Sequence, residues 1–252
     1  MIAAFLNHLW QSTVTVGAIA LVTLLLRGNR AQVRYALWFT ASMKFCVPFA
    51  LLVYVSSALA TSNVVTSAPV SHAAVSLSAG TAIDEIAQFV EPFDAKVTSG
   101  PASRPLMNLE AWTITLWIVG MAGVIAIRLR EWLRIRAMVR GSTVVEGIAV
   151  PARVTVRSTP SPISPCVIGW WRPVLLLPAG LEQLPRPEFD AVIAHEVCHV
   201  RRRDTLAAAA HMAVEAVFWF HPLVWWIGSR LVHERERACD EAVLALGVDP
   251  VD

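Results

Sequence analysis

Residues 187–203 read PEFDAVIAHEVCHVRRR, and this stretch predicts a helix. Proline at the first helical position with an acid in the first turn is a common helix start, and the basic run at the other end complements the helix dipole. Apolar residues recur at helical spacing and supply one buried face: Phe189, Val192, Ile193, Val197 and Val200. The helix therefore presents the pattern HEVCH, residues 195–199, in a defined orientation.

The HEVCH pattern predicts a catalytic zinc site. Positions four apart share one face of a helix, so His195 and His199 can bind one ion while Glu196 flanks it. Two imidazoles and a carboxylate leave zinc one open position for water, whose pKa the metal lowers to about 7. Glu196 would take the proton of that water as it attacks a peptide carbonyl and would then pass it to the leaving amine. A chance match is the alternative, and it arises well under about 1% of the time in a random chain of this length.

A third metal ligand is expected from ERERACD, residues 234–240. Glu236 and Asp240 stand four apart, so a second helix can present both on one face. We expect Glu236 to bind the metal and Asp240 to accept a hydrogen bond from the far nitrogen of a ligand imidazole, His195 in the first place. A solvated helical charge is the competing interpretation, since Glu234 and Glu241 are equally available on other faces.

Asp204 follows the three arginines at the end of the HEVCH helix. It is either a charge at the helix end or a hydrogen-bond partner of a metal ligand, and we favour the second interpretation.

The composition predicts a membrane protein. Hydrophobic residues make up 56% of the chain and charged residues 16%, whereas soluble proteins average about 25% charged. Three apolar runs are long enough to span a bilayer: 2–26, 36–60 and 111–127. The net charge of +2 is too small to suggest nucleic acid, so no direct nucleic-acid binding is expected. The four cysteines form no CxxC pair, which favours reduced thiols over a disulfide framework or a thiolate zinc site.

Basic residues set the expected orientation. Arginines cluster between the first two spans and again after the third, whereas residues 61–110 carry only Lys96 and Arg104 against five acids. The positive-inside rule therefore predicts a multi-pass protein of the cell membrane with its N-terminus outside, the loop 61–110 outside, and everything after Ile127 in the cytoplasm.

The predicted organisation has two parts. Residues 1–127 form the membrane region, and residues 128–252 form a cytoplasmic zinc metallopeptidase domain. In the second part, residues 143–156 suggest short strands, and two runs bounded by Pro and Gly within 163–177 suggest a small sheet or hairpin at an edge. The expected fold class is an α+β membrane protein: three N-terminal transmembrane helices followed by a mainly helical zincin-like domain with a small β-sheet.

The apolar stretch 206–232 provides an internal test. If it crossed the membrane once, Glu236 would lie on the side opposite His195 and the two could not share a metal. Pro222 near its middle, together with His211 and Glu215, makes it a poor lipid-facing helix. We therefore expect it to be broken or buried, either within the peptidase domain or against the bilayer surface.

This ordered set of motifs resembles the integral-membrane zinc peptidases of the BlaR/MecR antibiotic-sensor type. The resemblance rests on five stretches in order: SPCVIG at 164–169, PVLLLP at 173–178, HEVCHVRRRD at 195–204, PLVWW at 222–226 and ERACDEAVL at 236–244. It implies a cytoplasmic zinc endopeptidase of the gluzincin kind, with one zinc ion and the ligand set given above. It also implies that residues 163–177 form an edge strand along which a substrate lies as an added strand. In that family the peptidase relays an external signal by cleaving itself and helping to inactivate a transcriptional repressor.

The sequence also departs from the family pattern. It stops at Asp252 without a further span, a penicillin-binding domain or a serine acylation motif after the third span, which indicates a fragment or a shorter relative and gives no support to antibiotic sensing.

The leading hypothesis is a membrane-bound zinc endopeptidase that acts on a cytoplasmic regulatory protein or on itself in response to an outside signal. A membrane quality-control protease of the prenyl-protein-protease type is one alternative, and a non-catalytic membrane receptor or scaffold is another. Glu196 favours the enzymes, since a structural zinc site has no use for a general base. The sequence does not determine the oligomeric state.

Overall fold

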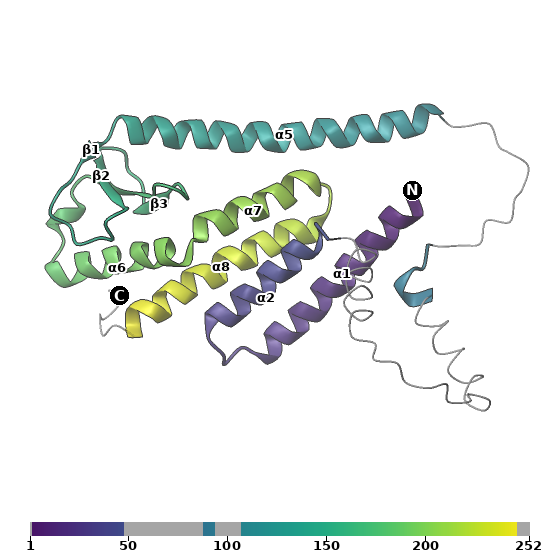
Figure 1. Cartoon of the computed structure of the whole chain (residues 1–252), viewed down its shortest axis with the longest axis horizontal. Helices are drawn as coiled ribbons and strands as arrows, with labels where there is room; N and C mark the ends of the chain where they lie inside the picture. Colours follow the sequence, from purple (N-terminus) through teal and green to yellow (C-terminus); the bar gives the residue numbers. More distant parts are fainter. Residues whose placement is uncertain (1, 48–87, 94–106, 246–252) are drawn as a thin grey trace, which may run out of the picture.

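The computed structural model describes residues 2–47, 88–93 and 107–245. These residues form a helical bundle with a small sheet at one end and one long helix along its side (Figure 1). The bundle consists of α1 (Ile2–Leu25), α2 (Ala31–Lys44), α7 (Asp204–Val217) and α8 (Pro222–Ala245). Its buried apolar core comprises Val16, Trp38, Ala41, Phe45, Val214, Phe218, Val224, Ile227 and Leu231. The mainly helical fold with a small sheet that the sequence predicts is confirmed.

Two helices in the described part of the chain are long and apolar enough to cross a membrane: Ala3–Leu25 and Ala111–Arg140. The sequence predicted three spans. The second of these two helices lies within α5 (Met107–Arg140). This helix continues well past Ile127, the predicted end of the third span, because arginine sustains a helix as well as most apolar residues do. The predicted domain boundary at 127/128 therefore falls inside one unbroken helix.

The second predicted span, 36–60, is described only in part, and that part does not continue as one helix. That part belongs to α2, which begins at Ala31 and ends at Lys44. Its 14 residues rise about 21 Å at 1.5 Å per residue, short of a bilayer core of about 30 Å. Residues 48–60 lie outside the described residues.

Two acids of α8 fasten it to α2. Arg34 donates a 2.8 Å hydrogen bond to Glu234, and both side chains are almost fully buried. The carboxylate of Glu241 accepts a 2.9 Å hydrogen bond from the backbone N–H of Ala31, at the start of α2. A carboxylate stabilises a helix N-terminus, since the first N–H groups have no partner within the helix. Both acids are therefore engaged away from the histidines.

The sheet has four strands in the order β1-β2-β4-β3. These are β1 (Thr143–Val144), β2 (Thr155–Thr159), β3 (Cys166–Ile168) and β4 (Val174–Pro178). β2 and β4 are parallel, and the other two pairs are antiparallel. The predicted hairpin within 163–177 is thus present as β3 and β4, with β3 at the edge of the sheet.

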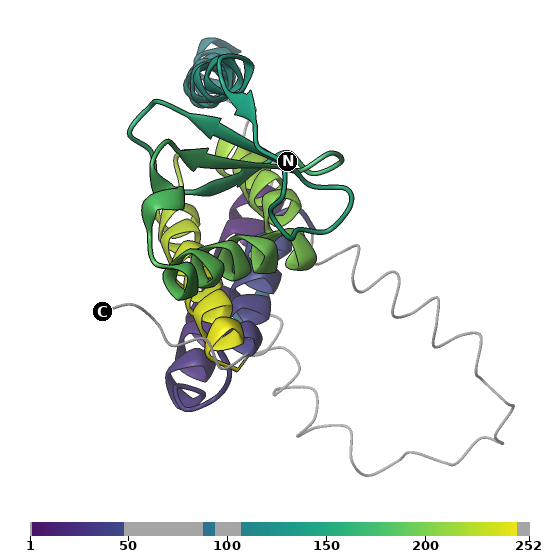
Figure 2. The same cartoon turned by 90° about the vertical axis from the view of Figure 1, so that its left-hand side faces the viewer.

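The sheet packs on α6 (Arg186–Arg202), and a short 3-10 helix, η1 (Leu181–Gln183), connects the two. Figure 2 shows the sheet between α5 and α6. Side chains of β2, of the residue before it and of β4 meet one face of α6 in a second core: Val154, Val156, Leu175, Leu177, Phe189, Ile193 and Val197. Because this core holds one face of α6 against the sheet, the opposite face of the helix points away from the sheet.

The apolar stretch 206–232 is broken, as expected. α7 ends at Val217, residues 218–221 turn the chain, and Pro222 opens α8. α8 runs back beside α7 and then passes α6 (Figure 1). This reversal returns residues 234–240 to the helix that carries HEVCH.

Candidate metal centre

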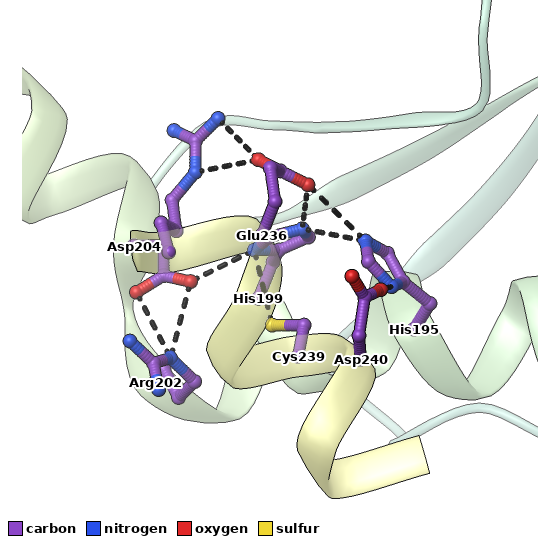
Figure 3. Close-up of polar contacts among 8 residues, drawn as sticks. His195, His199, Arg202, Asp204, Glu236, Cys239 and Asp240 are labelled. Carbon is purple, nitrogen blue, oxygen red and sulfur yellow. Dashed lines mark hydrogen bonds and ion pairs between the residues drawn. The ribbon is translucent and has the colours of Figure 1, made fainter. Parts of the chain in front are cut away.

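Three side chains from two helices converge at one point (Figure 3). His195 and His199 project from α6 with their Nε2 atoms 3.2 Å apart. Oε2 of Glu236, on α8, lies 3.3 Å from Nε2 of His195 and 3.5 Å from Nε2 of His199. The structure thus brings together the three residues that the sequence singles out as metal ligands.

This triangle of donor atoms fits a zinc ion. Zinc binds imidazole nitrogen and carboxylate oxygen at about 2.0–2.2 Å with tetrahedral angles, so two of its ligand atoms stand about 3.3–3.6 Å apart. The three separations of 3.2, 3.3 and 3.5 Å agree with that spacing. The Glu236 side chain is 41% exposed, which leaves one side of the triangle open to water or a substrate.

The charges at this point favour a cation. The hydrogen bond with Glu236 raises the pKa of His195 above its usual range. Burial lowers the pKa of His199, but hydrogen bonds with Asp204 and Glu236 outweigh it and raise this pKa to about 9. Hydrogen bonds from His195 and His199 hold the pKa of Glu236 well below its usual range. A site that holds protons on its imidazoles this strongly also stabilises a positive metal ion bound in place of those protons.

Each imidazole is held from behind by an aspartate. Nδ1 of His195 lies 3.1 Å from Oδ1 of Asp240, and Nδ1 of His199 lies 2.8 Å from Oδ2 of Asp204. A carboxylate on Nδ1 keeps the proton there and leaves Nε2 free to bind a metal. The geometry of both aspartates therefore suits the orienting role that the sequence suggested for them.

The turn between α6 and α7 places Asp204. Arg203 adopts a left-handed conformation with φ of 58°, which ends α6 and lets α7 begin at the next residue. This tight turn folds Asp204 back onto the last turn of α6, where it is buried and also accepts a hydrogen bond from Arg202. The sequence alone does not identify His199 as its partner, because this contact depends on the left-handed turn at Arg203.

Glu196 lies among the same groups and is only 7% exposed. Burial raises its pKa, while the neighbouring charges of His199 and His195 oppose that rise. A buried carboxyl group beside two imidazoles is placed to exchange a proton with a bound water molecule.

Two further residues shape the centre and were not predicted from the sequence. Arg235 donates hydrogen bonds of 3.0 and 2.8 Å to Oε1 of Glu236, which directs Oε2 toward the histidines. Cys239 is fully buried, with its sulfur 3.4 Å from Nδ1 of His199. Its spacing of three residues from Glu236 was the available signal, since i and i+3 share a helix face.

A second group of potential ligands lies on the Nδ1 side of His199: His199, Asp204 and Cys239. It shares its imidazole with the first group, and its aspartate already accepts hydrogen bonds from His199 and Arg202. We therefore assign these residues to holding the imidazole rather than to a second ion.

The substitution Asp204→Asn is expected to weaken zinc binding by about 10–100-fold, because the amide cannot hold the proton on Nδ1 of His199 as a buried carboxylate does. The measurement is a competition titration of the detergent-solubilised protein against a chromophoric zinc chelator. Asp240→Asn is the matched comparison. Since the Asp240 side chain is 61% exposed and that of Asp204 is 3% exposed, we expect a smaller loss. Equal affinity of Asp204→Asn and the wild type would contradict this role.

The helical fold and the convergence of HEVCH with Glu236 are those expected of a membrane metallopeptidase, and the comparison with known families agrees with this class. The chain belongs to the BlaR1 peptidase M56 family, whose model matches residues 3–248. The resemblance to membrane metallopeptidases of the BlaR/MecR type is thereby confirmed.

Among its relatives is the regulatory protein BlaR1 of Bacillus licheniformis, 26% identical over 176 residues, which cover 65% of this chain and 29% of that protein. Another is the methicillin resistance mecR1 protein of Staphylococcus aureus, 24% identical over 94 residues, which cover 37% of this chain and 16% of that protein. This chain therefore aligns with less than a third of the length of either relative.

Proposed function

We propose that this protein is a membrane-bound zinc endopeptidase that hydrolyses peptide bonds in a cytoplasmic regulatory protein, in itself, or in both, in response to an external signal. The observation that carries the proposal is the meeting of two imidazoles from α6 and one carboxylate from α8 at tetrahedral spacing, next to a buried glutamate. A structural zinc site is usually closed by four protein ligands and needs no such glutamate.

The proposed mechanism uses each residue in one role. His195, His199 and Glu236 hold the zinc ion, which when bound supplies Lewis acidity toward a water molecule and a peptide carbonyl. Glu196 accepts the proton of the attacking water and passes it to the nitrogen of the leaving amine. Asp204 and Asp240 keep both imidazoles in the tautomer whose Nε2 is unprotonated.

The edge strand β3 suits the binding of an extended peptide. β3 pairs only with β4 among the described residues and packs against α6, the helix that carries HEVCH. Burial raises the pKa of the Cys166 thiol on this strand, and the nearby charge of Glu196 adds to that rise. A peptide added to the free edge of β3 would therefore run past Glu196, held by main-chain hydrogen bonds.

Location and substrate follow from the charge pattern and the family. We propose a multi-pass protein of the cell membrane, with the N-terminus and residues 61–110 outside and the peptidase residues in the cytoplasm. A transcriptional repressor is one candidate substrate, since relatives are called a regulatory protein and a methicillin resistance protein. The bilayer and a protein substrate are the proposed partners, without direct nucleic-acid contact.

The test is metal-dependent proteolysis by the purified full chain. We expect about one zinc ion per chain by mass spectrometry of metals, together with cleavage of a mixture of quenched fluorescent peptides. A strong chelator should remove both, and stoichiometric zinc should restore both. Peptide cleavage that survives complete removal of the metal would exclude a metallopeptidase, and zinc binding without cleavage of any peptide or of the chain itself would favour the receptor or scaffold.

A further inference from the structure

The turn between β3 and β4, residues 169–172, carries two adjacent tryptophans that the proposed peptide hydrolysis does not use. Trp170 is 63% exposed and Trp171 is 85% exposed. Gly169 begins this tryptophan turn with a φ of 85°, in the left-handed region that glycine adopts without strain. Tryptophan has a large apolar surface, so two such side chains exposed at one turn indicate a contact with another apolar surface.

A hydrogen bond fixes the place of the tryptophan turn in the fold. The hydroxyl of Thr205, in the first turn of α7, donates a 3.2 Å hydrogen bond to the backbone carbonyl of Gly169. Just before Thr205 in the chain, the guanidinium carbon of Arg202 lies 5.1 Å from the centre of the Tyr35 ring on α2. The tryptophan turn therefore lies beside the start of α7, at the level of the first turns of α2.

This is also the level of the inner end of the first candidate span. The chain reverses between α1, which ends at Leu25, and α2, which begins at Ala31 (Figure 1), so the first turns of α2 lie beside the last turns of α1. Tyr35 packs against the bundle core together with Ile19 and Ala20 of α1. The arginines that follow α1 place this end of the span at the cytoplasmic side of the bilayer. Several leucines of these α1 turns are exposed, as lipid-facing residues are: Leu21, Leu24 and Leu25.

We propose that the tryptophan turn inserts into the cytoplasmic interface of the bilayer and holds the edge strand β3 against the membrane. Tryptophan is enriched at membrane–water interfaces, where its apolar ring meets the acyl chains and its N–H finds a polar partner among the headgroups. The proposal rests on the proposed membrane location of the chain and adds a lipid contact made by the peptidase residues themselves.

The charges around the turn fit the same lipid. Arg172 follows the two tryptophans and is exposed, and so are Arg201 and Arg203 at the end of α6. A guanidinium binds a phosphate group through charge-assisted hydrogen bonds, and the cytoplasmic leaflet carries anionic headgroups. Apolar rings bordered by exposed cations therefore match the change from acyl chain to phosphate that a bilayer presents at its surface.

The experiment measures tryptophan fluorescence of the full chain in nanodiscs of phosphatidylcholine and phosphatidylglycerol. The emission of the pair is the difference between the wild type and a double variant carrying Trp170→Phe and Trp171→Phe, which keeps an aromatic ring at both positions. Trp112, which is exposed in the candidate span of α5, provides the matched reference through Trp112→Phe. Both differences are measured again with phosphatidylcholine brominated on the acyl carbons near the glycerol, and circular dichroism checks that each variant keeps its helices.

We expect the brominated lipid to quench the pair about as strongly as it quenches Trp112, whereas aqueous acrylamide should quench the pair weakly. Quenching of Trp112 but not of the pair by brominated lipid would overturn the proposal, leave the membrane location intact and assign the tryptophans to a protein partner. If brominated lipid quenched neither Trp112 nor the pair, both the lipid contact and the proposed membrane location would be wrong, so the two failures can be told apart.

Discussion

Replacement of Glu196 with glutamine is expected to leave zinc bound and to lower peptide hydrolysis by about 10²–10⁴-fold, the usual contribution of a general base. Glutamine has nearly the same shape as glutamate, so the packing around this buried position is preserved. Its amide cannot accept a proton from the attacking water. Zinc content by metal mass spectrometry and the rate of peptide cleavage should be measured on the same sample.

A matched control for Glu196 is Glu182→Gln, which makes the same chemical change at an exposed position on η1. We expect it to retain both zinc and activity. Wild-type rates in the Glu196→Gln protein would eliminate the proposed mechanism, and loss of zinc from that protein would show that Glu196 holds the metal instead of moving a proton.

Replacement of Glu236 with alanine is expected to weaken zinc binding more than the loss of a residue that only orients a ligand. Loss of such an orienting residue typically weakens binding by about 10–100-fold. Glu236 supplies the one donor atom of the triangle that comes from α8. Its removal leaves two imidazoles on a single helix, and peptide cleavage should fall along with the bound zinc. Equilibrium dialysis against buffered zinc measures the change.

Asp240→Ala provides the comparison on the same helix, because it removes a carboxylate that contacts His195 on Nδ1. Its loss of affinity should be smaller than that of Glu236→Ala. If the two variants lost zinc equally, or if Glu236→Ala retained it fully, the third ligand would have to be another residue.

The part of the centre that could be predicted from sequence is the part set by helical spacing. His195 and His199 are one turn apart, as are Glu236 and Asp240, so each pair shares a face whatever the rest of the fold does. The structure brings these four residues together, although their roles in binding and catalysis stay predictions. The break in the stretch 206–232 was also foreseeable, because Pro222 cannot continue a helix interior.

The remaining features depend on contacts between distant parts of the chain. α2 begins at Ala31 because Glu241, 210 residues away, accepts a hydrogen bond from its first N–H. The buried pair of Arg34 and Glu234 likewise joins α2 to α8. Hydropathy reports how apolar a run is but not which residue caps it, so the apolar run that begins at residue 36 does not mark the start of this helix at Ala31. The same contacts explain why Glu236, and not Glu234 or Glu241, faces the histidines.

The most direct test of the shared centre is zinc-edge X-ray absorption of the purified full chain, which reports the elements and distances around the ion. We expect only nitrogen and oxygen atoms at about 2.0–2.2 Å from the ion, with an imidazole signature, and a reduced signal from bound zinc in Glu236→Ala. Sulfur at about 2.3 Å would place Cys198 or Cys239 on the metal and contradict the assignment of two histidines and one glutamate.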